Sequence, residues 1–313
     1  MANPTRVATA YDGSNSTFRL FRACGGCELL MNLGWYPFYG PLSILNLAVD
    51  MPKAEIRLVT KSAALLNIEA GNAVLDVACG RGKSSYMIAQ LYPGCTVTGV
   101  DLLPENIQVA RTLFGNSPGL NYVVGDAMDL EVADESVDRV HCLEAAFHFP
   151  DRARFLREAY RVLRDGGSLV VVDFAWKTAD GHRLRDEEPA RLVRQVWQFD
   201  DFFSIEEYRQ AARDAGLEVQ SCRDWTRHVS QRIVRQFSVA AWLGQRNWGR
   251  RLLTLLHPLL WGTSDSDWRE LKASAEASRR FSRHYVYMAF VFRKPRQHAP
   301  QQEHVAQRRD GGL

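Results

Sequence analysis

The sequence predicts an α/β protein built on a doubly wound, mostly parallel seven-stranded sheet with helices on both faces. Strand-like and helix-like runs alternate from Lys53 to Asp173, as they do where a parallel sheet is covered on both sides. Within this region the apolar run 73–77 leads directly into a glycine turn, and the next run, 95–101, ends on an acidic residue. A strand, a glycine turn and a following acid are the elements with which such sheets bind a nucleoside-bearing ligand.

The first predicted element of this region is a helix over residues 53–67. Apolar side chains recur there at helical spacing, so that they share one face: Ile56, Val59, Ala63 and Leu66. Strands and helices then alternate up to Asp173, which we predict to end the fifth strand.

The pattern changes after the fifth strand. A helix is predicted around 188–197. Residues 204–207 have the Ser-x-x-Glu spacing of a capping box and predict a second helix that stops before Gly216. Two further strands are predicted, at 217–225 and 284–292, and we expect them to be neighbours in the sheet.

These elements divide the chain into four regions. Residues 1–50 are rich in aromatic residues and glycine and precede the first strand. Residues 51–225 and 283–296 form the predicted core. The long, apolar and aromatic insertion 226–282 is predicted to be a helical cap over a substrate pocket. The polar tail 297–313 is expected to be disordered, because it has little apolar surface to bury.

Composition and patterning exclude several classes of function. The net charge is only +3 and the folded part lacks a dense basic block, so we expect no nucleic-acid partner. No run of ~18 apolar residues occurs, so we expect no transmembrane segment.

Within the cap, Trp242 and Trp261 are expected to shape the choice of substrate. The apolar stretch 252–261 is expected to pack inside the cap rather than to touch a membrane, because no strongly basic face accompanies it.

The cysteines and the first residues indicate the compartment. The chain has six scattered cysteines, which is typical of reduced thiols in a cytoplasmic enzyme. The start of the sequence lacks the apolar segment of a signal peptide. Cys24 and Cys27 form a single Cys-x-x-Cys pair, without further ligands at a spacing suited to zinc. We therefore expect a cytoplasmic protein without a metal site.

The glycine turn carries the most specific signal. The dinucleotide fingerprint requires a third glycine where this chain has Ser85. Asp76 adds a carboxylate before the turn, which would repel a pyrophosphate but suits a cationic amino-acid group. Gly80 and Gly82 allow the backbone to approach a ligand closely. The carboxylate of Asp101 can accept hydrogen bonds from ribose hydroxyls.

These residues resemble the first motif of class I S-adenosylmethionine (SAM) methyltransferases. Further motifs of that family follow in order at 99–101, 125–127, 136–140 and 160–173. The resemblance extends over roughly residues 60–175. It implies a Rossmann-like methyltransferase fold that binds SAM, releases S-adenosylhomocysteine (SAH) and works without a metal.

The resemblance also implies which residues contact the cofactor. Asp76 is expected at the methionine end, Asp101 at the ribose and Asp126 at the adenine. Trp35 and Tyr36 resemble aromatic residues that close over SAM, so residues 1–50 are expected to form a lid. The expected cofactor contacts are Tyr11, Trp35, Tyr36, Asp76, Ala78, Gly80, Gly82, Asp101, Leu102, Asp126, Ala127 and Leu143.

His148 is the predicted general base. It follows the fourth strand, at the edge of the sheet where ligands bind. A neutral imidazole can take the proton that a hydroxyl loses on methylation, and Asp173 behind the ring would fix its tautomer. This pair resembles the His and Asp of bacterial natural-product O-methyltransferases, including those that act on sugars. The alternative is a histidine packed among Phe147, Phe149 and Pro150.

The sequence therefore predicts an enzyme that moves a methyl group from SAM to a hydroxyl of a bulky, largely apolar small molecule, such as a secondary metabolite. Aromatic residues outside the core sheet suit such an acceptor. One alternative is C-methylation of an aromatic, terpenoid or polyketide substrate, as in the ubiquinone, sterol and tocopherol relatives. Another is SAM-bound cyclisation or a non-catalytic role, because fold alone does not fix the reaction. The oligomeric state stays open, a homo-oligomer included.

Overall fold

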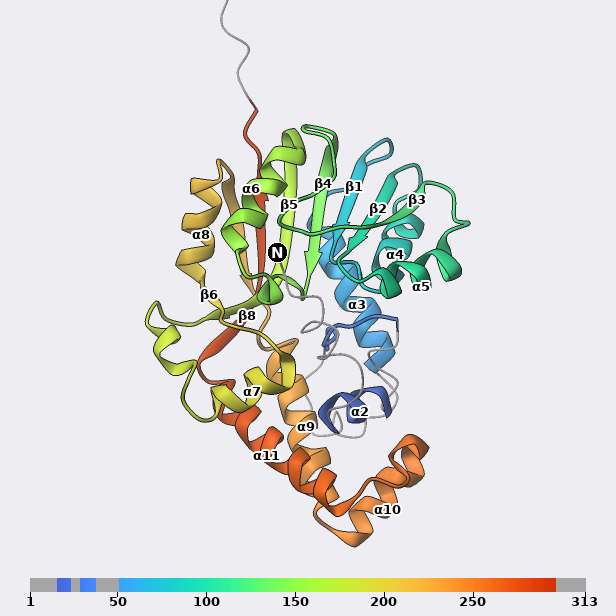
Figure 1. Cartoon of the computed structure of the whole chain (residues 1–313), viewed down its shortest axis with the longest axis vertical. Coiled ribbons are helices and arrows are strands. Elements are labelled where there is room, and N and C mark those ends of the chain that lie inside the picture. Colours follow the sequence, from blue (N-terminus) through green and yellow to red (C-terminus); the bar gives the residue numbers. More distant parts are fainter. Residues whose placement is uncertain (1–15, 24–28, 38–50, 297–313) are drawn as a thin grey trace, which may run out of the picture.

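The computed structural model describes residues 16–23, 29–37 and 51–296, and the predicted disordered tail 297–313 lies outside them. These residues form a central sheet with helices on both faces and a group of helices beyond one edge of the sheet (Figure 1). Deeply buried side chains from both faces of the sheet make up the largest clusters of the core.

The sheet follows the order β3-β2-β1-β4-β5-β8-β7, with a short strand, β6, paired to β5 off this path. All pairs are parallel except those that β8 makes with β5 and β7. The seven strands of the path match the predicted number, and β6 adds an eighth of only two residues. The strands are β1 (Ala73–Val77), β2 (Thr96–Asp101), β3 (Leu120–Val124), β4 (Val137–Leu143), β5 (Leu163–Trp176), β6 (Phe203–Ser204), β7 (Glu218–Asp224) and β8 (Tyr285–Arg293).

Helices cover both faces of the sheet. Helices α6 and α8 pack on one face, and α3, α4 and α5 pack on the other. The α-helices are α2 (Ser16–Ala23), α3 (Met51–Ala64), α4 (Lys83–Leu91), α5 (Pro104–Phe114), α6 (Arg152–Val162), α7 (Ala190–Trp197), α8 (Ile205–Asp214), α9 (Ser230–Gly244), α10 (Asn247–Leu256) and α11 (Asp265–Phe281). Short 3-10 helices join these elements in the described ranges: η2 (Ala146–His148), η3 (Gly181–Leu184) and η4 (Pro258–Leu260).

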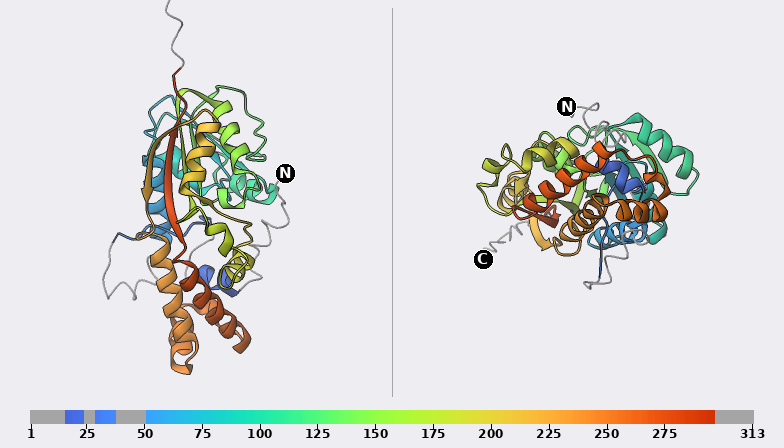
Figure 2. Two further views of the ribbon diagram at one scale, coloured as in Figure 1. Left: turned by 90° about the vertical axis from the view of Figure 1, so that its left-hand side faces the viewer. Right: turned by 90° about the horizontal axis from the view of Figure 1, so that it is seen from below.

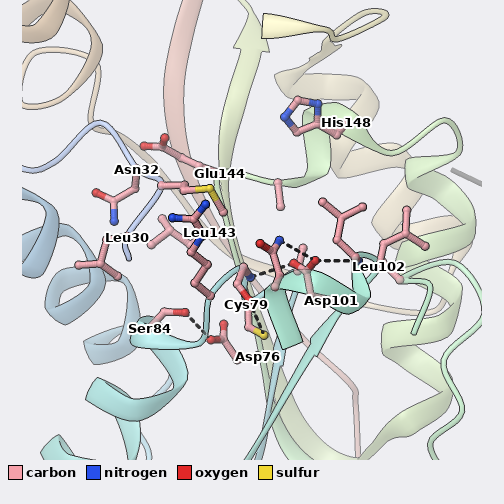
Figure 3. A pocket seen from close by; sticks show the side chains of 18 of the residues that line it. Leu30, Asn32, Asp76, Cys79, Ser84, Asp101, Leu102, Leu143, Glu144 and His148 are labelled. Atoms are coloured by element: carbon pink, nitrogen blue, oxygen red, sulfur yellow. Dashed lines mark hydrogen bonds between the residues drawn. The ribbon is translucent and has the colours of Figure 1, made fainter. Parts of the chain in front are cut away.

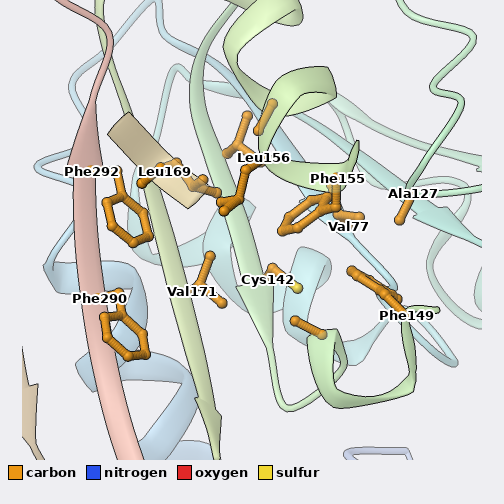
Figure 4. Packing of buried hydrophobic residues seen from close by; sticks show 14 of the residues in the cluster. Val77, Ala127, Cys142, Phe149, Phe155, Leu156, Leu169, Val171, Phe290 and Phe292 are labelled. Atoms are coloured by element: carbon orange, nitrogen blue, oxygen red, sulfur yellow. The ribbon is translucent and has the colours of Figure 1, made fainter. Parts of the chain in front are cut away.

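The apolar run of β5 suits a strand inside the sheet, where β5 lies between β4 and β8. Successive side chains of a strand point to opposite faces, so a strand covered on both sides must be apolar throughout. Leu169 and Val171 pack toward α6 and α8, whereas Val170 and Val172 pack toward the other layer (Figure 4). Burial of each such side chain contributes about 1.5–3 kcal/mol to folding.

The local signals after the fifth strand are confirmed. The Ser204 hydroxyl accepts from the backbone N–H of Glu207, and the Glu207 carboxylate accepts in return from the N–H of Ser204. This capping box starts α8. Strands β7 and β8 are antiparallel neighbours, as expected.

The insertion between β7 and β8 forms α9, α10, η4 and α11, which extend away from the sheet (Figure 2). Helices α2 and α7, from distant parts of the chain, pack against α11. The group has a core of its own, in which Phe18 of α2 meets Phe237 of α9 and Trp268 of α11.

Candidate cofactor and acceptor site

A cavity of about 330 Å³ lies at the carboxyl ends of β1, β2, β3 and β4 (Figure 3). In an open α/β sheet this edge is where ligands bind. The segment 29–32 closes the cavity from the N-terminal part of the chain. The structure brings nine of the predicted site residues to this cavity: Asp76, Ala78, Gly80, Asp101, Leu102, Asp126, Ala127, Leu143 and His148.

The turn after β1 is fixed by its backbone. Ala78 and Gly80 both adopt positive φ, with 56° at each residue. The N–H of Cys79 donates to the carbonyl of Val100, and the N–H of Gly80 donates to Oδ2 of Asp101, at 2.9 and 2.8 Å. The turn and the acid at the end of β2 are therefore a single hydrogen-bonded unit, although they lie on different strands.

Asp101 is the buried acceptor of this unit. Its Oδ1 accepts from the backbone N–H of Leu103 and from Nδ2 of Asn106, each at 3.0 Å. Burial raises the pKa of Asp101 above its usual value, and these hydrogen bonds oppose that rise. Because a carboxylate offers about four acceptor positions, capacity remains for a ligand hydroxyl. The acceptor carboxylate of Asp101 and the apolar walls at Leu102 and Leu143 fit an adenosine-bearing cofactor.

Asp76 is held by protein groups on both of its oxygens. Its Oδ2 accepts from the hydroxyls of Ser84 and Ser85, at 2.6 and 2.7 Å. Its Oδ1 lies 2.8 Å from Nδ1 of His141, and the other ring nitrogen lies 2.8 Å from the hydroxyl of Ser62. The sequence did not indicate His141, which only the pairing of β1 with β4 brings beside Asp76. The contact of Asp76 with the methionine end of SAM stays a prediction.

Gly82 serves packing and does not line the cavity. It precedes α4 with φ of 83°, and an added Cβ would lie 2.5 Å from Cβ of Ala110 and 2.7 Å from the Tyr122 ring. The Tyr122 hydroxyl also donates to the Gly82 carbonyl at 2.6 Å. The glycine of the motif thus permits close contact between α4, α5 and β3.

Gly82→Ala is expected to lower the free energy of unfolding by roughly 2–4 kcal/mol, because backbone strain and overpacking add. Gly71→Ala is the matched control: it has φ of 84° but no atom within 4 Å of an added Cβ. Gly71→Ala should therefore cost only the strain, about 1–2 kcal/mol. If urea denaturation gave equal losses in the free energy of unfolding for the two variants, the packing role assigned to Gly82 would be wrong.

The aromatic residues expected over the cofactor lie elsewhere. Trp35 stacks on His228 with ring centroids 4.3 Å apart and meets the edge of Trp225. Tyr36 is buried, and neither ring is among the residues that line the cavity. The segment reaches the cavity through Leu29, Leu30, Met31 and Asn32 instead, and Tyr11 lies outside the described residues.

A second, smaller cavity of about 80 Å³ adjoins the first. Most of its walls are apolar or aromatic, and they come from β5, β8, α7, α9, α11 and the segments beside them: Leu33, Phe147, Phe174, Val193, Trp197, Phe199, Phe202, Ile233, Val234, Phe237, Phe281 and Tyr285. Met31, Asn32 and Glu144 line both cavities. Trp242 and Trp261 line neither and are exposed, so the structure does not place these two rings at the pocket as predicted.

Glu144 is the ionisable residue among those that line both cavities. It follows β4 directly and is 8% exposed. The Tyr287 hydroxyl donates to its Oε1, and the N–H of Leu33 lies 3.1 Å from both carboxylate oxygens. Burial raises the pKa of Glu144 to about 7, with Asp173 adding to the rise and these two donors opposing it. The sequence signal that could have identified Glu144 as a site residue is a single acidic side chain in the apolar run after the fourth strand.

His148 lies at the end of η2 and lines the cofactor cavity, where its ring contacts Phe147 at a centroid distance of 4.1 Å. The ring therefore has an aromatic neighbour on one side and borders the cavity on another. In Figure 3 the side chains of His148 and Glu144 both lie above Asp101, whereas Asp76 lies below it. Its role as a base stays a prediction.

Asp173 does not end its strand. Pairing with β8 continues as far as Trp176, so β5 is three residues longer than predicted, and that prediction is wrong. Asp173 is fully buried on the face of α6 and α8, where the Tyr208 hydroxyl donates to it and Nε of Arg152 lies 3.9 Å away. Burial raises its pKa to about 6. Its carboxylate is thus not brought to the cavity that His148 lines.

The described part of the chain also bears on metal binding and membrane insertion. There, no group of three or more His, Cys, Asp or Glu side chains is arranged to hold a metal ion. Cys24 and Cys27 lie outside the described residues. Over the same ranges, no helix combines the length and the apolar character needed to cross a membrane.

Known proteins with similar sequences are methyltransferases. Residues 75–171 match a family model described as a methyltransferase domain. The chain is 34% identical over 185 residues to O-methyltransferase resE of Aspergillus sclerotiorum, a match covering 57% of this chain and 68% of that protein. It is 33% identical over 191 residues to 27-O-demethylrifamycin SV methyltransferase of Amycolatopsis mediterranei, covering 58% and 67%. It is 35% identical over 188 residues to 2-methyl-6-phytyl-1,4-hydroquinone methyltransferase of a Synechocystis strain, covering 57% and 58%.

Solved structures share the fold at low sequence identity. The [4+2]-cyclase SpnF is 19% identical, with a TM-score of 0.65 over 93% of this chain and 97% of that one. Geranyl diphosphate methyltransferase in complex with GPP and sinefungin is also 19% identical, with a TM-score of 0.65 over 93% and 98%. The glycine turn, the acid at the end of β2 and the sequence similarity to known methyltransferases agree with one another. The chain therefore belongs to the class I SAM-dependent methyltransferases, and SAM is its cofactor.

Proposed function

We propose that this enzyme transfers the methyl group of SAM to a hydroxyl of a bulky, largely apolar small molecule in the cytoplasm. The observation that carries the proposal is the aromatic cavity, which shares Met31, Asn32 and Glu144 with the cofactor cavity. Apolar and aromatic walls with few polar groups are typical of pockets for large organic ligands. The names of two relatives, resE and the rifamycin enzyme, refer to O-methylation and support this choice.

In this proposal the residues of the turn hold the cofactor and the aromatic cavity holds the acceptor. When bound, SAM supplies an activated methyl group, so the protein has to provide alignment and proton removal. Alignment of two reactants can remove about 7–11 kcal/mol of the barrier. The aromatic walls exclude water from the acceptor, and the Glu144 carboxylate would accept a hydrogen bond from its hydroxyl.

We propose His148 as the base that takes the hydroxyl proton, with Glu144 as a positioning group. The lone pair of a neutral imidazole can accept the proton near neutral pH. Glu144 already accepts from Tyr287 and Leu33, which fixes its carboxylate at the junction of the cavities. Asp173 has no part in this proposal, because it does not line the cofactor cavity and its carboxylate accepts a hydrogen bond from Tyr208.

C-methylation is the second candidate function. The relative named 2-methyl-6-phytyl-1,4-hydroquinone methyltransferase favours an aromatic acceptor with an apolar tail. Such a ring needs less help from a base because its oxygen already activates the carbon.

The test is turnover of SAM to SAH with a panel of hydroxylated polyketides, terpenoids and prenylated hydroquinones, with the methylated position located by NMR. An O-methyl product supports the proposal. A product methylated only on carbon would select the second candidate, and cyclisation without SAH formation would refute both.

Val234→Phe is expected to raise the KM of a bulky acceptor about tenfold, because the added ring atoms occupy a small cavity. Val234 lines the aromatic cavity and is half-buried on α9. The matched control is Val239→Phe, on the same helix with similar burial but lining neither cavity. The Kd of SAH, measured by calorimetry, should stay within about twofold in both, because α9 does not line the cofactor cavity. Equal acceptor KM values in the two variants would contradict the assignment of this cavity.

A further inference from the structure

An exposed apolar stripe runs along α10 and η4, at the end of the molecule farthest from the sheet (Figure 1). Trp248, Leu252, Leu255 and Leu256 are exposed, and their i, i+4, i+7, i+8 spacing places them on one face of the helix. The stripe continues beyond the helix, where Leu259 is 77% and Trp261 is 84% exposed. We call these six residues the α10 stripe.

The α10 stripe is additional to the surface that holds the helices together. Leu253 of α10 and Leu260 of η4 are the residues that enter the core shared with α2, α9 and α11. The expectation that 252–261 packs inside the cap is therefore correct for these two side chains and wrong for the stripe. Exposed contiguous apolar surface of this kind marks an interaction site.

Basic residues outnumber acidic ones beside the α10 stripe, although one of them, Arg250, is paired with Asp265 at the start of α11. Residues 242–264 contain three arginines and no acidic residue. Arg251 lies on α10 beside Leu252 and is exposed. Arg246 stacks over the exposed Trp242 ring at 3.7 Å, and Trp242 meets Trp248 edge-on at 6.0 Å. Arginines and tryptophans beside exposed leucines are the composition of helices that lie in an anionic membrane interface.

We propose that the α10 stripe docks on the surface of an anionic lipid bilayer. A second copy of the chain fits less well, because a two-fold contact would bring the basic surface of one copy against that of the other. Lipid headgroups of negative charge would instead be attracted by the arginines while the leucines and tryptophans enter the acyl boundary.

The same helices connect this surface with the acceptor cavity. Helices α9 and α11 line the aromatic cavity through Val234 and Phe281 and carry α10 between them (Figure 2). Docking at α10 would thus tether the enzyme to a lipid surface, where apolar acceptors are concentrated, through the helices that also line the proposed acceptor pocket.

The experiment is flotation of the full chain with vesicles of phosphatidylcholine alone and with ~30% phosphatidylglycerol, at low and high salt. Wild type should float with the anionic vesicles, and exposed tryptophan fluorescence should shift to the blue. Leu255→Glu/Leu259→Glu should lower the partition coefficient at least about tenfold, because two apolar contacts are lost and two like charges are added. Arg251→Glu should weaken anionic binding and reduce its salt dependence.

The matched control is Leu113→Glu on α5, which replaces a leucine of 52% exposure far from the α10 stripe. It should bind vesicles as wild type does. Thermal unfolding and SAH affinity should be unchanged in all variants, since each altered side chain is exposed. Absence of flotation, equal loss in Leu113→Glu, or a concentration-dependent dimer that Leu255→Glu/Leu259→Glu dissociates would overturn the proposal.

Discussion

His148→Ala is expected to lower the rate of methyl transfer to a hydroxyl by about 10²–10⁴, the range for loss of a positioned general base. The affinity for SAH should be nearly unchanged, because His148 is one of many residues around the cofactor cavity and is assigned to the acceptor. His284→Ala is the matched control, since His284 is exposed and lies outside both cavities. Single-turnover rates and calorimetry with SAH separate the chemical step from binding.

Glu144→Gln is the second arm of this test. The amide keeps the shape of the side chain and a carbonyl that can accept from Tyr287, but it cannot ionise. Because burial raises the pKa of Glu144 to about 7, its carboxylate form grows as the pH rises through that value. If the ionised form positions the acceptor, the wild-type rate should rise with pH around 7. In Glu144→Gln the part of the rise that belongs to Glu144 should disappear.

The two variants also show which group is the base. Glu144→Gln should raise the acceptor KM and reduce the rate less than His148→Ala does, because its assigned role is to position the hydroxyl. Full activity in His148→Ala, together with a loss of about 10²–10⁴ in Glu144→Gln, would transfer the base role to Glu144. Little effect of either variant would favour C-methylation, or an acceptor that is ionised before it binds.

Asp101→Ala is expected to weaken SAM and SAH binding ~10- to 150-fold, because a hydrogen bond to a charged acceptor contributes ~1.5–3 kcal/mol. The substitution also removes the acceptor that holds the N–H of Gly80, so the turn loses a support as well. Calorimetry with SAH measures this loss of affinity directly.

Glu105→Ala is the matched control for Asp101. Glu105 also lines the cofactor cavity but is exposed on the first turn of α5. If a general negative charge at the rim held the cofactor, the two variants would lose similar affinity. Unchanged affinity in Asp101→Ala would remove Asp101 from the site altogether.

The sequence was sufficient for the fold and for most of the predicted residues that line the cofactor cavity. These features depend on neighbouring residues: the apolar run of each strand, the glycines of the turn, the acid that ends β2 and the capping box at Ser204. Local backbone preferences and side-chain periodicity act over a few residues, so a sequence displays them directly. The positions of Gly80 and Asp101 at one cavity followed from the parallel arrangement of β1 and β2.

The acceptor end was decided only by the tertiary structure. Asp173 lies inside β5 and not at its carboxyl end, because pairing with the distant strand β8 continues to Trp176. Glu144 becomes part of the site because residues 29–33 fold back over it and Leu33 donates to its carboxylate. Trp35 stacks on His228 and therefore does not lie over the cofactor cavity. Which leucines of 252–261 enter the core depends on where α2, α9 and α11 leave room. Contacts between residues far apart in the chain have no local signature, and the packing of the whole molecule determines them.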